Sequence, residues 1–146
     1  MSIELTKFDF VWLILLAILV LVIIIWLIGR KIKKSEAEDY VLEKIKKQWA
    51  EIESLVNQNS ATAWKLAIME ADKLLDYALK SIGAPGKDLG ERLKAYGYKY
   101  PKIKEVWPAH KVRNCLVHET DYQLNKGVAK RSLEQFKKAL KVLKVL

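Results

Sequence analysis

The first apolar feature of the chain is an unbroken run from Phe10 to Ile28, which contains neither a charged residue nor a proline. As an α-helix it extends for roughly 28 Å, about the thickness of the hydrocarbon core of a bilayer. Trp12 and Trp26 lie near its ends, where interfacial aromatic residues are found. Core helices of soluble proteins seldom run this far without a polar residue, and a cleaved signal peptide has a shorter apolar region. The pattern predicts a single transmembrane helix over residues 10–28, preceded by a short tail of residues 1–9.

The charges on the two sides of this run are unequal. Before it, Lys7 is the one basic residue and is accompanied by Glu4 and Asp9. After it, four basic residues follow within six positions: Arg30, Lys31, Lys33 and Lys34. Because basic flanks remain on the cytoplasmic side, we expect a single-pass protein of the cell (inner) membrane with its N-terminus outside and its C-terminal part in the cytoplasm.

A polar linker with a repeating apolar stripe is predicted over residues 29–58. Ser35, with Glu38 three positions later, is typical of a capping box that opens a helix. Apolar residues then recur at alternating spacings of 3 and 4, namely Leu42, Ile45, Trp49, Ile52 and Val56. This is the spacing of a coiled-coil seam and favours a short dimerising stalk. The alternative is an amphipathic helix that lies on the domain or on the membrane surface.

Residues 59–146 have the periodicity of several amphipathic helices and lack the alternation of strands. A polar break at residues 57–60 precedes the first predicted helix, and a loop is expected over residues 97–101. The predicted helices cover Ala61–Ile82, Asp88–Ala95, Pro108–His118 and Asn125–Leu146. The first carries an apolar stripe of Trp64, Ile68, Ala71, Leu75, Ala78 and Leu79, and the last one of Ala129, Leu133, Phe136, Leu140 and Leu143. The short connections favour an all-α domain built as an antiparallel bundle of about four helices.

The charge of the chain suits an anionic partner. The formal net charge is +9, and residues 1–29 contribute −1 of it, which leaves +10 on the rest. Nucleic acid and lipid headgroups both fit such a surface, and charge alone does not separate them. Glu70, Asp72 and Asp76 are interpreted as a solvated acidic face of their helix.

The cysteine and histidine content bounds the chemistry. Cys115 is the only cysteine, which excludes an internal disulfide and fits a reducing compartment. The two histidines, His110 and His118, have no cluster of cysteine and carboxylate residues around them, so no metal site and no cofactor is expected.

One segment, from Arg113 to His118, has a composition that suits chemistry on a phosphate. Successive helical residues turn by about 100°, which places Asn114 and His118 on one face, with His110 one turn further. Arg113 lies about 140° around from His118, so the two meet over one phosphate most readily if their side chains reach around or if a second copy contributes. A histidine can move a proton from a ribose hydroxyl, and an arginine can stabilise charge on phosphate oxygens.

An arginine, a polar residue, three further residues and a histidine near the end of a helix in a small all-α domain resemble the HEPN superfamily (higher eukaryotes and prokaryotes nucleotide-binding). The resemblance covers about Ser60 to Leu146. Many HEPN domains are metal-independent endoribonucleases that act as dimers, often in toxin or defence systems, whereas others are noncatalytic modules. The resemblance implies that His118 transfers the proton, that Arg113 holds the phosphate and that Asn114 orients them.

The sequence thus predicts a membrane-anchored, homodimeric HEPN-like protein that binds RNA as a metal-independent endoribonuclease or as an RNA-binding module, with a cognate protein as a further partner. The alternative is a noncatalytic scaffold, tethered to the bilayer and dimerised by its stalk, that recruits a protein partner. A third hypothesis is that the basic surface holds the domain against anionic lipid.

Overall fold

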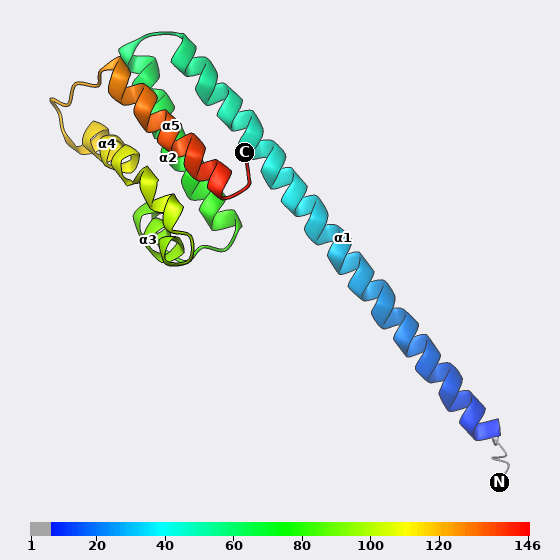
Figure 1. The fold of residues 1–146 in the computed structure, drawn as a ribbon. Helices are drawn as coiled ribbons and strands as arrows, with labels where there is room; N and C mark the ends of the chain where they lie inside the picture. The colour runs from blue at the N-terminus through cyan, green and yellow to red at the C-terminus, as the bar shows by residue number, and fades with distance from the viewer. Residues whose placement is uncertain (1–6) are drawn as a thin grey trace. The chain divides into compact units, whose positions relative to one another are not determined.

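The computed structural model describes the backbone of residues 7–146 and the side chains of residues 11–31, 36 and 38–146. Over this part of the chain every regular element is a helix and no strand is present, which confirms the all-α prediction (Figure 1). The elements are α1 (Lys7–Asn57), α2 (Ala61–Ser81), α3 (Leu89–Lys99), the 3₁₀ helix η1 (Pro101–Val106), α4 (Trp107–His118) and α5 (Lys126–Val142).

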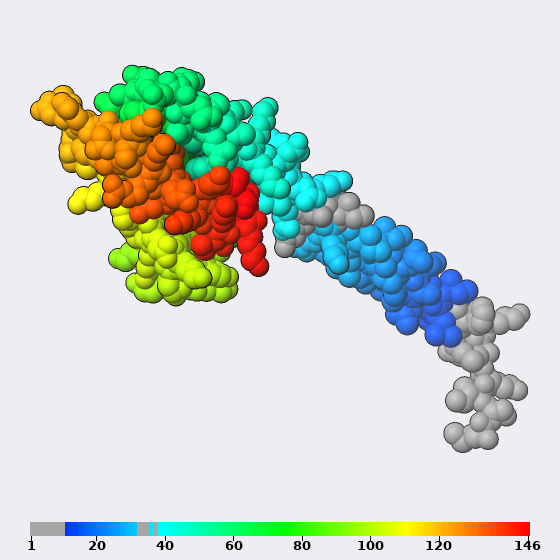
Figure 2. Space-filling view, turned by 45° about the horizontal axis from the view of Figure 1, so that its top comes forward, coloured from blue at the N-terminus to red at the C-terminus, as the bar shows by residue number. Residues whose placement is uncertain are grey.

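The contacts within the chain divide it into two units, Met1–Tyr40 and Val41–Leu146. The first unit contains the segment Val11–Lys31, whose mean hydropathy is 3.5 and whose side chains are not buried. Its large apolar side chains are 47–63% exposed, and Figure 2 shows them in blue at the surface of the face drawn. By length and composition this helix can cross a membrane. The predicted first residue of the span, Phe10, lies outside the described side chains.

No helix begins at Ser35, contrary to the capping-box prediction. The backbone of α1 is helical through this position, and the side chain of Ser35 lies outside the described ones. A cap requires that the preceding residues leave the helix, but Arg30 and the lysines around it are good helix formers. Gly29 disfavours a helix by only about 1 kcal/mol relative to alanine, which does not stop its propagation.

The apolar stripe of the predicted stalk belongs to the core of the second unit. Ile45, Trp49 and Ile52 are 0%, 5% and 3% exposed, and Leu42 and Val56 pack beside them. Figure 1 shows this part of α1 alongside α2 and α5. The compact unit therefore begins at Val41, earlier than the boundary expected at residue 59. A 3-and-4 spacing suits any partner helix, and here the partners are helices of the same chain.

The predicted stripes of α2 and α5 are confirmed as core. Ile68, Leu75 and Leu79 of α2 and Phe136 and Leu140 of α5 are all fully buried. Ser60 begins α2 as predicted from the polar break, because its Oγ accepts a hydrogen bond from the backbone N–H of Ala63 at 3.1 Å.

Two helix ends differ from the prediction by more than one residue. Helix α3 starts after its cap Asp88 but continues to Lys99, through the residues expected to form a loop. Helix α5 ends at Val142, short of the expected Leu146. There Lys144 adopts a φ of +59°, and the N–H of Val145 bonds the carbonyl of Leu140 at 3.2 Å, which turns Val145 back into the core.

Candidate functional site

A polar cavity of about 570 Å³ lies between α2, α4 and the segment that leads into α3. The three residues predicted to form the site, Arg113, Asn114 and His118, all line it. The other lining residues are Asp72, Lys73, Asp76, Lys87, Asp88, Leu89, Gly90 and His110. Helix α4 therefore presents its polar face to a hollow in the surface, with lysines from two other segments around it.

Arg113 and His118 border this cavity within one chain, although they lie far apart around the axis of α4. The long Arg113 side chain turns toward α2, where its Nε lies 3.3 Å from Oδ2 of Asp72. Its Nη1 donates a hydrogen bond to Oδ1 of Asn114 at 3.1 Å. The reach of the arginine side chain overcomes the angular separation, so the two residues share one cavity without a second copy.

Asp72 is the site residue that sequence reasoning missed. It was interpreted as part of a solvated acidic face, but it is 4% exposed. Its Oδ1 lies 2.7 Å from Nδ1 of His110, while its Oδ2 faces Arg113. A buried carboxylate requires such partners because desolvation of an unpaired charge is costly. The signal was available, since Asp72 follows Ile68 by four residues and precedes Leu75 by three, which places it in the buried stripe.

His110 is held from two sides. Its side chain is 13% exposed, and the ring of Trp107 packs edge-on against it at 5.7 Å between centroids. When Nδ1 carries the proton it donates to Asp72, and Nε2 is then an acceptor. A Cβ on Gly90 would lie 3.8 Å from that Nε2, so the missing side chain keeps the ring's other edge open.

His118 is the free member of the site. It is exposed at the end of α4 and, within the described part of the chain, has neither a hydrogen bond nor an ion pair. An imidazole in this position can approach a ligand in the cavity and exchange a proton with it.

The charges around the cavity are balanced in pairs. Asp76 accepts a hydrogen bond from Nη1 of Arg92 at 2.6 Å, and Asp72 faces Arg113. The buried Nε atoms of Arg92 and Arg113 make no hydrogen bond among the described atoms, although the latter is within ion-pair distance of Asp72. Lys87 and Lys73 lie at the rim together with Asp88, and Lys73 is paired with Glu70 at 2.8 Å. The ammonium groups of these exposed lysines can still pair with an anionic ligand.

Cys115 does not have the properties of a nucleophile. A hydrogen bond to the Glu119 carboxylate, and then partial burial, raise the pKa of the Cys115 thiol above its usual value and favour the protonated form. Among the described residues no group of three or more histidine, cysteine and acidic residues is arranged to hold a metal ion.

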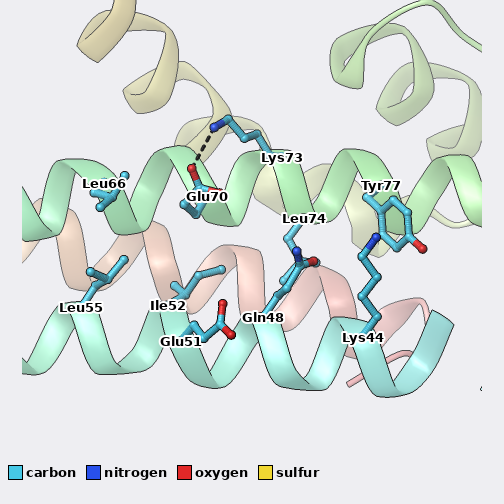
Figure 3. Close-up of a pocket in the computed structure, with 10 residues that line it drawn as sticks. All are labelled: Lys44, Gln48, Glu51, Ile52, Leu55, Leu66, Glu70, Lys73, Leu74 and Tyr77. Atoms are coloured by element: carbon cyan, nitrogen blue, oxygen red, sulfur yellow. Dashed lines mark hydrogen bonds and ion pairs between the residues drawn. The ribbon is translucent and has the colours of Figure 1, made fainter. Parts of the chain in front are cut away.

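A second hollow, of about 480 Å³, lies between α1 and α2 (Figure 3). Its apolar lining comes from Ile52, Leu55, Leu66 and Leu74, and neither histidine nor cysteine is among its described lining residues. The ammonium of Lys44 lies 4.4 Å from the ring centroid of Tyr77, and Lys73 pairs with Glu70 at 2.8 Å. This groove has the composition of a contact surface rather than of a reaction site.

Comparison with family models, with curated proteins and with solved structures gives no match to this chain. In the part of the chain that the structure describes, the fold is an all-helical domain that follows an apolar helix in the sequence, with a polar cavity lined by residues of α2 and α4.

Proposed function

We propose that the protein is a membrane-anchored, HEPN-like endoribonuclease that works without a metal ion. The observation that carries the proposal is the common cavity of Arg113, Asn114 and His118, with His118 left unpaired within the described part of the chain. The lysines at the rim and the formal charge of +9 add the attraction that a polyanion requires.

In the proposed reaction, the ribose 2′-hydroxyl oxygen attacks the adjacent phosphorus atom, and the bond from phosphorus to the 5′-oxygen of the next nucleotide breaks. The products are a 2′,3′-cyclic phosphate and a 5′-hydroxyl end, whose oxygen takes its proton from water. His118 takes the proton of this hydroxyl as general base, and the guanidinium of Arg113 stabilises the charge that develops on the phosphate oxygens. Asp72 holds Arg113 from behind, and Asn114 fixes one of its nitrogen atoms through the 3.1 Å hydrogen bond. These supports position the guanidinium before the substrate arrives.

The proposal includes a homodimer in which the open side of the cavity meets the same surface of a second copy. The resemblance to HEPN domains, many of which cleave as dimers, motivates this part. A cognate protein that covers the cavity is the further partner that a toxin or defence function implies.

The proposal also places the protein in the cell (inner) membrane, with the N-terminus outside and the domain in the cytoplasm. The apolar segment Val11–Lys31 and the basic residues that follow it support this orientation. A reporter fused after Leu146 should be active only on the cytoplasmic side. Activity only on the outer side would overturn the orientation.

The test of the enzyme uses the full chain in detergent micelles, single-stranded RNA and excess EDTA. His118→Ala should lower the cleavage rate about 10²-fold to 10⁴-fold, the usual contribution of a general base. Arg113→Ala should also lower the cleavage rate strongly, whereas Lys111→Ala, an exposed change on the same helix outside the cavity, should not. Cleavage that EDTA stops, or that survives in His118→Ala, would refute the proposal.

The second candidate function is a noncatalytic, membrane-tethered scaffold that recruits a protein partner. The groove between α1 and α2 favours it, because Leu66 is 44% exposed there beside the partly buried Leu55. The stalk that first suggested self-association no longer supports it, since Ile45 and Trp49 are buried within the chain. A folded parent without ribonuclease activity, whose partner is lost on Leu66→Asp, would favour the scaffold.

A further inference from the structure

The segment from Lys94 to Lys104 combines aromatic rings with lysines and contains no acidic residue. It comprises the second half of α3 and the start of η1, at the end of the bundle away from the connection between α1 and α2 (Figure 1). Its exposed tyrosines and lysines are Lys94, Tyr98, Lys99, Tyr100, Lys102 and Lys104, which we call the tyrosine–lysine surface. Tyr98 is 76% exposed, the highest value among the described large apolar and aromatic side chains.

The packing below this surface explains why rings and ammonium groups point outward. Ile103 of this segment is 0% exposed, and Val106, two residues after its end, is 1% exposed, so they supply its attachment to the core. Gly97 allows a close approach, because a Cβ there would lie 2.7 Å from Cε of Lys104. The Lys104 side chain therefore lies across the helix, with its ammonium 5.5 Å from the ring centroid of Tyr98.

The rings are presented as flat platforms. Tyr100 stacks on Tyr96 with 4.5 Å between centroids and 20° between planes, and the ammonium of Lys99 lies 5.5 Å from the Tyr100 centroid. Exposed rings interleaved with cations are the pattern that binds single-stranded nucleic acid, since bases stack on the rings and phosphates pair with the cations. The segment connects to the cavity through Trp107, which follows η1, is 38% exposed and packs against His110.

We propose that the tyrosine–lysine surface binds single-stranded RNA by base stacking and feeds it toward the cavity. This inference rests on the proposed function and adds its substrate class. A lipid surface is disfavoured because membrane-binding faces present exposed Leu, Phe or Trp, whereas the aliphatic residues of this segment are buried and its exposed rings are tyrosines. Duplex RNA is disfavoured because its bases are already stacked and cannot be taken up by the rings.

The experiment measures binding of the full chain in neutral-lipid nanodiscs to a fluorescent oligouridine, to a duplex RNA of equal length and to anionic phosphatidylserine vesicles. Tyr98→Ala should weaken oligouridine binding about 5-fold to 150-fold, the range for the loss of one base–aromatic stack. Tyr40→Ala, at an exposed tyrosine of the other unit, should leave it unchanged. Because the Tyr98 side chain is so exposed, we expect Tyr98→Ala to leave stability unchanged. The melting curve of this variant, followed by circular dichroism, should match that of the parent chain.

Electrostatic contacts are tested separately through salt. Lys102→Gln should reduce the slope of log affinity against log salt by about 0.7, the loss of one phosphate contact on a single strand. Equal oligouridine affinity of Tyr98→Ala and the parent would overturn the inference. Equal weakening of duplex binding, or a loss confined to the anionic vesicles, would overturn it as well.

The two proposals fail in different ways. RNA cleavage that depends on His118 but not on Tyr98 would keep the ribonuclease and remove the binding surface. Tyr98-dependent binding of oligouridine without cleavage would keep the binding surface and remove the ribonuclease.

Discussion

Replacing Asp72 with alanine should destabilise the Val41–Leu146 unit far more than the loss of a surface carboxylate. The Asp72 side chain is 5% exposed and serves both His110 and Arg113. A hydrogen bond to a charged group contributes about 1.5–3 kcal/mol, and removing one partner of a buried ion pair costs about 3–5 kcal/mol. His110 and Arg113 are 13% and 28% exposed, so water partly solvates them after the change. The expected loss is about 2–4 kcal/mol in the free energy of unfolding.

The matched control is Glu70→Ala on the same helix. Glu70 pairs with Lys73, but the two side chains are 41% and 60% exposed. A surface pair of this kind contributes about 0–1 kcal/mol, so the control should stay close to the parent. Urea unfolding of the full chain in micelles is followed by circular dichroism. The change in unfolding free energy of each variant is obtained from the shift of its unfolding midpoint, provided that the dependence of the free energy on urea concentration is unchanged.

A double-mutant cycle separates the interaction energy between Asp72 and His110 from the cost of truncating each side chain. Asp72→Ala and His110→Ala should show a coupling energy of at least about 1 kcal/mol, as directly contacting polar residues do. A coupling energy near zero, or equal losses for Asp72→Ala and Glu70→Ala, would refute the assignment of Asp72 as the buried support of the site.

Two further predictions concern α1. A hydrogen bond from Lys137, 2.6 Å away, lowers the pKa of the Glu53 carboxyl below its usual 4.5. Because the folded-state pKa is the lower one, this pair stabilises the fold above pH 4.5 and loses that contribution as the pH falls through the folded-state pKa. Glu53→Gln should reduce the dependence of the unfolding free energy on pH below pH 4.5. The change should be less than about 1 kcal/mol because the carboxylate is half exposed. The same pH dependence in Glu53→Gln and the parent would contradict this. Ile45→Asp, which the stalk interpretation predicts to give folded monomers, should instead unfold the domain at a cost above about 4 kcal/mol, whereas the exposed Lys46→Asp should not. A folded Ile45→Asp chain in the same urea titration would show that the buried position is misassigned.

The parts of the fold that the sequence predicts well are those decided by local periodicity. The stripes that contain Ile68 and Phe136 are buried as predicted, and the Ser60 cap begins α2 where the polar break indicated. The unbroken apolar run also predicts the helix from residue 11, which by length and composition can cross a membrane.

The parts that the sequence does not decide depend on partners far along the chain. The spacing of Ile45 and Trp49 identifies a packing face but not whether it meets a second copy or the same chain. The capping pattern at Ser35 is a local preference that the continuing helix overrides. Asp72 and His110 lie 38 positions apart, so their contact follows from the packing of α4 on α2 and not from any motif.

The site shows the same division. Residue types and spacing placed Arg113, Asn114 and His118 together on α4, and the structure brings them to one cavity. Helix angles alone leave open whether Arg113 and His118 meet because their side chains reach around the helix or because a second copy contributes. In the structure the arginine side chain reaches around within one chain, because Asp72 draws the guanidinium toward α2.

The core joins Ile45, near the start of the second unit, with Val145, near the end of the sequence. In a chain made from its N-terminus, the helix that carries Ile45 is synthesised long before α5 and the turn at Lys144. The part of its apolar face that α2 does not cover must therefore stay exposed until Phe136, Leu140 and Val145 have emerged. Contacts between residues so far apart in the sequence form late, which slows folding and leaves an aggregation-prone intermediate during synthesis. For a nascent chain of this kind, early capture of the preceding apolar helix by a membrane would keep neighbouring unfinished chains apart.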